Sequence, residues 1–266
     1  MTELQSPQPD FRGCQAAPVD GYVRFQHGDC HVVACEWAAP AIRGALAQGT
    51  LHEWAAAQDT CDPMRGRGIS YGVMLPAGPA LQSQTPVVVR RNRHGGLFRF
   101  LTGEYFLMPT RAPLELATAL RLAGAGVATP QVIAYAVYPF SRFFARSDVM
   151  TRRLPEGADF PDVWRRADAS GRDALLRAVA RLLCDLSRAG AWHADLNLKN
   201  IYIAGRASDV TPYVLDVDRV TFPGGKCASR NFQRLARSVR KWRDKWGLDF
   251  TEDALEHLAV LAQEKN

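Results

Sequence analysis

Three acidic or amide side chains stand in an order that can perform chemistry. Asp195 and Asn200 enclose four residues in the segment WHADLNLKN, and Asp216 follows sixteen residues after Asn200, in VLDVDR. A carboxylate beside an acceptor hydroxyl orients it and takes its proton late in a displacement, whereas a second carboxylate and a carboxamide oxygen are hard magnesium ligands. The pattern therefore predicts phosphoryl transfer from a magnesium-bound nucleotide, with Asp195 as the catalytic residue and Asn200 and Asp216 as metal ligands.

Neighbouring residues indicate that this loop is supported. His193 stands two residues before Asp195, where loops of this spacing carry a histidine that braces the backbone rather than reacting. Asp218 either helps to hold the metal region or pairs with a cation near Arg219. Alternatively, Asp195 and Asn200 only cap turns after a helix, as aspartate and asparagine often do. The ordered VLDVDR segment and a glycine-rich hairpin upstream favour the catalytic interpretation.

Other catalytic motifs are missing from the sequence. It contains no GxSxG, HExxH or GxxxxGK[ST] pattern, and the glycine pair in GRG is too short to indicate a dinucleotide site. These absences argue against a serine hydrolase of that type, a zinc protease and a P-loop nucleotidase.

The elements that must position the loop follow from local patterns. Apolar residues recur every three or four positions across 171–190, which predicts a helix that ends at Gly190, just before the loop. The runs IYIA and PYVLDV predict a hairpin with Asn200 at its entrance and Asp216 at its exit. The segment from Arg230 is predicted to be mostly helical.

The first half of the chain predicts a sheet. GYVRF and HVVACEW are typical of short strands, and RGRGISYGVML followed by PVVVRR predicts a hairpin with a glycine-rich start. Residues 113–123 predict a helix with Glu115 near its start, and VIAYAVY and FFARSDVMT predict a second hairpin. LPEGADFP is interpreted as a connector.

This order of elements predicts an α+β protein with two lobes. We expect a flexible N-terminus at 1–20 and a lobe at 21–153 that consists of a nucleotide-binding sheet and one helix. The lobe at 154–266 is expected to carry the catalytic loop, the metal site and basic C-terminal helices.

The chain resembles the lipopolysaccharide core kinases, and most closely the 3-deoxy-D-manno-octulosonic acid (Kdo) kinase family. The resemblance covers about residues 65–245. Its motifs are GRG, VVVRRNRHGGL, TRAPLEL, SDVMTRRLPEG, WHADLNLKNIYI, VLDVDRV and RNFQRLARSVRKW. The HxDLNxxN loop combined with DxD in place of DFG is fairly specific to this group, and the arginine-rich strand followed by two glycines is more specific.

The resemblance implies a protein-kinase-like fold with an antiparallel-sheet N-lobe and a mainly helical C-lobe. It implies transfer of the γ-phosphate of ATP, with Mg²⁺, to the 4-OH of a Kdo residue on a lipid A precursor. Asp195 matches the catalytic aspartate, Asn200 and Asp216 match the metal-binding pair, and Glu115 matches the glutamate that braces the phosphate-binding strand. Asn197 stands where protein serine/threonine kinases usually have lysine, which favours a small or lipid-linked acceptor.

The nucleotide-binding residues depart from the general kinase pattern. The strand that should end in a lysine reads VVVRR, so Arg90 takes the phosphate-binding position, although Arg91 and Arg93 compete for it. Gly66 and Gly68 are interpreted as nucleotide-binding residues, with simple turn glycines as the alternative.

The C-terminal segment is strongly basic. Residues 226–245 contain eight lysines and arginines against one acid, Asp244, in a chain of net charge +6. Such a helix suits the anionic surface of a membrane, and the alternative is an ordinary C-lobe helix with its basic face in water. No apolar run is long enough to span a membrane, and MTELQSPQPD does not resemble a signal peptide. We therefore expect a peripheral protein on the cytoplasmic side of the inner membrane.

Several alternatives remain open at this point. The acceptor is a heptose of the same core or another small molecule in one alternative, and the chain is a non-catalytic nucleotide-binding pseudokinase in another. Nucleic-acid binding is not expected, because the chain contains no RNA-binding motif or zinc-finger spacing. The oligomeric state is not predicted.

Overall fold

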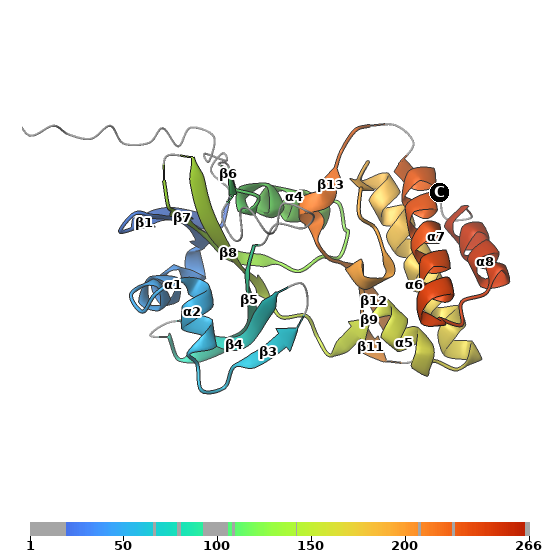
Figure 1. The fold of residues 1–266 in the computed structure, drawn as a ribbon, viewed down its shortest axis with the longest axis horizontal. Helices are drawn as coiled ribbons and strands as arrows, with labels where there is room; N and C mark the ends of the chain where they lie inside the picture. Colours follow the sequence, from blue (N-terminus) through green and yellow to red (C-terminus); the bar gives the residue numbers. More distant parts are fainter. Residues whose placement is uncertain are drawn as a thin grey trace, which may run out of the picture. The chain divides into compact units, whose positions relative to one another are not determined.

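The computed structural model describes residues 20–65, 68–78, 81–92, 106–107, 110–141, 143–206, 209–224 and 227–263. The chain divides into two compact units (Figure 1). The first comprises residues 1–116 and 132–153, and the second comprises residues 117–131 and 154–266. The helix 112–124 belongs to both, because the division passes through it.

An antiparallel sheet forms the frame of the first unit. Its strand order is β1-β2-β7-β8-β5-β4-β3, and β6 pairs with β8. The elements are β1 (Tyr22–His27), β2 (Cys30–Cys35), η2 (Glu36–Ala38), α1 (Ala39–Leu46), α2 (Leu51–Ala56), β3 (Asp62–Arg65), β4 (Ile69–Ala77), β5 (Ser83–Arg91), β6 (Phe106–Leu107), α4 (Ala112–Gly124), β7 (Val132–Pro139) and β8 (Phe144–Arg152). The predicted strands, the two hairpins and the helix with Glu115 are confirmed.

The prediction of one helix in this lobe is wrong, because α1 and α2 pack against the sheet (Figure 1). With eight and six residues, these helices are too short to give a clear apolar periodicity. Their start signals are visible in the sequence: a proline opens α1, and Thr50 and Glu53 form a capping box at α2.

Neighbouring arginines at the end of β5 lie on opposite faces of the sheet, as strand geometry requires. β5 pairs with β4 on one side and with β8 on the other, and Arg90 is opposite Val149 of β8. Before the arginines, Val87 and Val89 are fully buried in a core that includes Leu75 and Met150. This central strand therefore holds the two arginines on a packed support.

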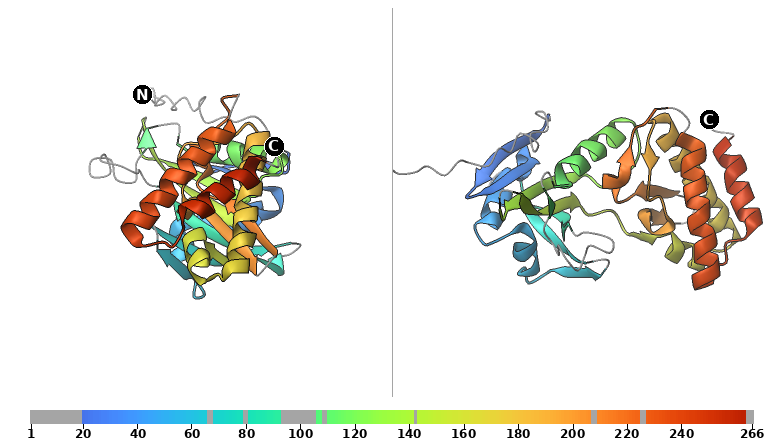
Figure 2. Two further views of the ribbon diagram at one scale, coloured as in Figure 1. Left: turned by 90° about the vertical axis from the view of Figure 1, so that its right-hand side faces the viewer. Right: turned by 45° about the horizontal axis from the view of Figure 1, so that its top comes forward.

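Four helices and two small sheets make up most of the second unit. The elements are β9 (Gly157–Asp159), α5 (Phe160–Arg166), α6 (Ala169–Arg188), β10 (Trp192–His193), η4 (Leu198–Asn200), β11 (Ile201–Arg206), β12 (Asp209–Val214), η5 (Val217–Arg219), β13 (Val220–Thr221), α7 (Cys227–Trp246) and α8 (Glu252–Gln263). Figure 2 shows α7 and α8 with α6, which contacts both of them. The helix over 171–190, the hairpin after Asn200 and the helical tail are confirmed.

Two predictions about this region need correction. The expected connector LPEGADFP contains β9, which pairs with β11, and the first residues of α5. Residues 117–131 belong to the second unit rather than to the lobe expected at 21–153. Two hydrogen bonds attach this segment to β12 of the second unit. The Val214 N–H donates to Ala128 O (2.9 Å), and the Thr129 hydroxyl donates to Val214 O (3.0 Å).

Candidate active site

His193 connects the predicted catalytic loop to the turn that precedes Asp216. The histidine is fully buried, its Nδ1 accepts from the Asp195 N–H (3.2 Å), and its Nε2 lies 3.0 Å from Leu215 O. Because Nδ1 is the acceptor, Nε2 carries the ring proton and donates a hydrogen bond to Leu215 O. Burial lowers the pKa of His193, so the neutral ring that this pattern requires is favoured. The ring thus joins the two predicted site segments.

Asn200 adds a second connection between the same segments. It ends η4 and is buried, its Nδ2 donates to Asp195 O (2.8 Å), and its own carbonyl accepts from the Leu215 N–H (2.9 Å). The bond from Nδ2 fixes the plane of the carboxamide and directs Oδ1 away from Asp195 O. Asn200 is therefore hydrogen-bonded to Leu215, the residue before Asp216, at the open end of the β11–β12 hairpin.

Asp216 has an unusual backbone conformation. Its φ of 52° and ψ of 46° are in the left-handed region, where a residue other than glycine costs on the order of 1–3 kcal/mol. Strain of this kind concentrates where the surrounding structure must aim a side chain. Asp218, two residues later, is partly buried and lies 3.9 Å from Arg219 Nε, which makes this a long ion pair.

Three polar residues of α7 hold the loop from the other side, and sequence reasoning missed them. Asn231 accepts from the His193 N–H (3.0 Å) and donates to Ala191 O (2.8 Å). Ser238 Oγ accepts from the Leu198 N–H (3.1 Å). Arg234 donates from Nε to Ala194 O (3.0 Å) and from Nη2 to Asp195 Oδ1 (2.6 Å).

These residues are separated by three and four positions, so they share one helix face. Asn231 is fully buried and Ser238 is 5% exposed, although both are polar. The sequence signal for these contacts was a row of polar residues within the apolar face of α7, because buried polar groups need hydrogen-bond partners. That row indicates contact with a backbone segment, but it does not say which one.

The first unit contains the other predicted residues. Glu115 is buried and forms an ion pair with Arg90 Nη2, while Arg90 Nη1 donates to Asn92 Oδ1 (2.7 Å). Arg91 instead contacts Asp148 on the neighbouring strand β8 (3.4 Å) and Thr50 at the start of α2 (3.4 Å). Of the two adjacent arginines, Arg90 is therefore the one that pairs with Glu115.

The glycine-rich hairpin start is only partly described. Gly68 is half-buried in the bend before β4, whereas Gly66 and Arg93 lie outside the described residues. The structure thus groups Arg90 with Glu115 in the first unit and His193, Asp195, Asn200 and Asp216 in the second.

The donors in the second unit fit a magnesium ion that arrives with a nucleotide. Asn200 and Asp216 supply one carboxamide and one carboxylate group, and magnesium is usually held by one or two such groups together with phosphates and water. Within the described residues, no cluster of three or more histidine, cysteine, aspartate or glutamate side chains is placed to hold a metal ion. A metal cage built entirely from such side chains is thus not found in that part of the chain.

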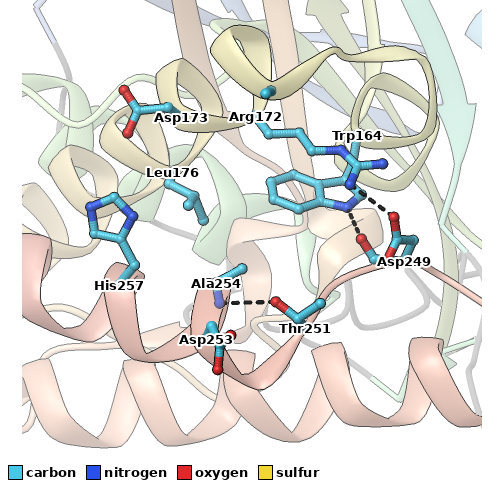
Figure 3. A pocket seen from close by; sticks show the side chains of 10 residues that line it. Trp164, Arg172, Asp173, Leu176, Asp249, Thr251, Asp253, Ala254 and His257 are labelled. Carbon is cyan, nitrogen blue, oxygen red and sulfur yellow. Dashed lines mark hydrogen bonds and ion pairs between the residues drawn. The ribbon is translucent and has the colours of Figure 1, made fainter.

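A separate pocket lies among α5, α6 and α8 (Figure 3). Its volume is about 320 Å³, and its residues include Trp164, Arg172, Asp249 and His257. Trp164 donates to Asp249 O (2.6 Å), and Arg172 pairs with the Asp249 carboxylate (2.9 Å). None of the predicted site residues lines this pocket, so it is distinct from the candidate active site.

Comparisons with known proteins show the family and the fold. Residues 53–259 match the model of the lipopolysaccharide kinase (Kdo/WaaP) family. The chain is 27% identical over 206 residues to a 3-deoxy-D-manno-octulosonic acid kinase of Vibrio cholerae, which covers 76% of this chain and 81% of that protein. It is 29% identical over 184 residues to a kinase of the same name from Stenotrophomonas maltophilia, covering 67% and 68%.

A solved structure shows the same architecture. The structure described as WaaP in complex with acyl carrier protein superposes with a TM-score of 0.52 at 19% identity and covers 88% of each chain. The predicted protein-kinase-like α+β fold is confirmed. The chain belongs to the lipopolysaccharide kinase (Kdo/WaaP) family and is a phosphotransferase.

Proposed function

We propose that the protein transfers the γ-phosphate of ATP to the 4-OH of a Kdo residue on a lipid A precursor. The observation that carries this proposal is the hydrogen-bond network of the second unit, in which His193 and Asn200 join the Asp195 loop to Leu215, the residue before Asp216. This arrangement supplies one carboxylate for a hydroxyl and a separate oxygen pair for a metal ion. The resemblance to Kdo kinases supplies the acceptor.

In this mechanism Asp195 accepts a hydrogen bond from the acceptor hydroxyl and orients its oxygen toward the γ-phosphorus. A bond from that oxygen to phosphorus forms, the bond to the β-phosphate oxygen breaks, and Asp195 takes the hydroxyl proton. Asn200 and Asp216 would hold a magnesium ion, which would neutralise charge on the phosphates. Arg90 contacts the phosphates of ATP, and Glu115 fixes the orientation of its guanidinium group.

We also propose that the end of α7 contacts the anionic cytoplasmic face of the inner membrane. The rings of Trp242 and Trp246 are in contact with centroids 4.5 Å apart and planes tilted by 43°, and Trp246 is 49% exposed. Lys241 lies 5.7 Å from the Trp246 ring, whereas Lys199 lies 5.8 Å from the Trp242 ring. Lysines beside exposed tryptophan suit the headgroup region of a bilayer.

Two basic residues of α7 are less suited than Lys241 and Lys245 to the proposed membrane contact. Arg240 and Arg243 both pair with Glu252, so part of their charge is compensated within the protein. Within the described residues, no helix has the length and apolar character needed to cross a bilayer.

Vesicle sedimentation tests the membrane proposal. The triple variant Lys241→Ala, Lys245→Ala and Trp246→Ala should bind vesicles with anionic lipids at least about 30-fold more weakly than the native protein does, since each of the two basic residues contributes about 1 kcal/mol. Equal binding by the two proteins would refute this surface.

Labelled phosphate transfer tests the proposed reaction. Native protein and Asp195→Asn are incubated with labelled ATP and magnesium, and with either a Kdo-bearing lipid A precursor or a heptosylated core acceptor. We expect label on the 4-OH of Kdo, located by NMR of the product, and a loss of about 10²- to 10⁴-fold in the variant. Transfer to heptose alone would establish the alternative acceptor, and magnesium-dependent ATP binding without transfer would support the pseudokinase.

A further inference from the structure

We propose that Arg234 is a positioning residue that sets the orientation of the Asp195 carboxylate, an inference that rests on the proposed role of Asp195. Arg234 Nη2 donates to Asp195 Oδ1 at 2.6 Å, and Arg234 Nε donates to the carbonyl of the preceding residue, Ala194, at 3.0 Å. One planar guanidinium group therefore donates hydrogen bonds both to the side chain of Asp195 and to the backbone just before it.

The double contact distinguishes Arg234 from an ordinary surface cation. Exposed ion pairs usually contribute little because two long side chains must be ordered in solvent. Here the side chains of Arg234 and Asp195 are 30% and 29% exposed, and both acceptors lie on the same loop. Because the guanidinium donors have fixed relative directions, satisfying the Ala194 carbonyl also fixes where the carboxylate oxygen must lie.

The position of Arg234 is itself set by its neighbours on α7. Asn231, one turn earlier, is fully buried and bonds to His193 and Ala191 on the loop. Ser238, one turn later, bonds to Leu198. With the helix tied to the loop on both sides of Arg234, its register along the loop is determined, and the arginine cannot shift to another acceptor without breaking buried hydrogen bonds.

The consequence for catalysis is an oriented carboxylate. Asn200 and Asn197 both donate to the carbonyl of Asp195, so the backbone of this residue is fixed from one side. Arg234 restrains the side chain of Asp195 by donating to Oδ1. The carboxylate is then presented to the acceptor hydroxyl in one orientation, and small errors in that orientation reduce the rate of transfer strongly.

A competing role for Arg234 is direct binding of an anionic group on the acceptor, such as the carboxylate of a Kdo sugar. The two roles have different kinetic signatures. Loss of positioning lowers kcat and leaves the KM for both substrates nearly unchanged, whereas loss of a binding contact raises the KM for the acceptor.

Steady-state kinetics of Arg234→Ala and Arg234→Lys test the proposal. We expect kcat to fall by about 10- to 100-fold in Arg234→Ala, with the KM values for ATP and acceptor within about twofold of native. Guanidinium added to the medium should restore part of the activity of Arg234→Ala, and Arg234→Lys should fall between native and alanine because lysine keeps the charge but lacks the planar fork.

Arg177→Ala is the matched control, because it breaks the Arg177–Asp173 pair of α6 (2.8 Å) in a more exposed setting. This control should have native kcat. The proposal is overturned if Arg234→Ala keeps native kcat, or if only the KM for the acceptor rises.

Hydrogen exchange of the 193–198 amides separates this proposal from the identity of the acceptor. Exchange should be faster in Arg234→Ala than in Arg177→Ala, whichever sugar is the substrate. Equal exchange in the two variants would overturn the proposed positioning role of Arg234. Failure of the native protein to phosphorylate Kdo, with faster exchange in Arg234→Ala, would refute only the proposed acceptor, and the kinetics would then be repeated on the sugar that is phosphorylated.

Discussion

The two units hold their candidate functional groups in different ways. In the second unit, buried groups that carry no charge at neutral pH fix the loop backbone: His193, Asn200, Asn231 and Ser238. In the first unit, the candidate phosphate-binding Arg90 is held by an ion pair with a buried side chain, that of Glu115. In the second unit, most residues that support the loop backbone are thus different from the residues proposed to react. In the first unit, a single ion pair, Arg90–Glu115, both supports and supplies the group proposed to bind phosphate.

This difference predicts how each site responds to substitution. Removing a supporting residue in the second unit should damage the fold and the reaction together, because the same backbone carries both. Removing the charge of Asp195 or Asp216 should instead change the chemistry and leave the fold intact. In the first unit, the adjacent arginines of β5 allow the two effects to be separated within one strand.

The largest effect is expected from Asn231→Ala. The substitution leaves the His193 N–H and the Ala191 carbonyl without their partner, and an unsatisfied buried group costs about 1–3 kcal/mol each. Chemical denaturation should show this loss of stability, and phosphate transfer should fall as well. Ser238→Ala, which affects only the Leu198 N–H, provides the comparison and should be about half as costly. Equal stability of Asn231→Ala and native protein would contradict the supporting role.

Asp216→Asn removes the negative charge of this side chain and keeps a residue type that can adopt the left-handed backbone conformation. Asparagine tolerates the left-handed conformation that Asp216 adopts, so the fold should be retained. Affinity for magnesium-ATP should fall by about 10- to 100-fold, the range seen when support of a metal site is lost. Calorimetry with and without magnesium measures this change, and nucleotide binding that is unaffected by the substitution would remove Asp216 from the metal site.

Arg90→Met and Arg91→Met separate binding from stability in the first unit. Arg90→Met should raise the KM for ATP by about tenfold, equivalent to roughly 1.4 kcal/mol. Arg91→Met should leave the KM unchanged but destabilise the fold by about 1–3 kcal/mol, because Asp148 is fully buried and loses an interaction with a cation. Burial raises the pKa of Asp148, and loss of the Arg91 charge should raise it further. If Arg91→Met raised the KM for ATP and Arg90→Met lowered stability, the proposed roles of the two arginines would be exchanged.

How much the sequence predicts depends on the range of the interactions involved. The helix over 171–190 is predicted by a local pattern and is found as predicted. The Asp195 to Asn200 spacing is also a local pattern, and the catalytic role that it indicates stays a prediction. The contact of Asn231, Arg234 and Ser238 with the loop joins residues about forty positions apart, and no local pattern specifies such a partner. The choice between Arg90 and Arg91 was also not decidable, because it depends on which face of the sheet meets Glu115.

The smallest expected effect is a dependence of stability on pH through His193. Burial lowers the pKa of this histidine in the folded protein below its usual value of about 6.5. Below pH of about 6.5 the unfolded chain therefore binds a proton that the folded protein does not, so the free energy of unfolding decreases as the pH falls toward the lowered pKa. Above that pH the contribution of His193 to stability is complete.

Denaturation of native protein and His193→Asn at several pH values between about 5.5 and 7.5 isolates this contribution. The slope difference should be at most about 1.4 kcal/mol per pH unit, so the cost of the substitution should shrink at the acidic end. If the cost of His193→Asn were the same at both ends of the range, the neutral ring would not be what joins the Asp195 loop to Leu215, and the separation of supporting from reacting groups in the second unit would lose its central member.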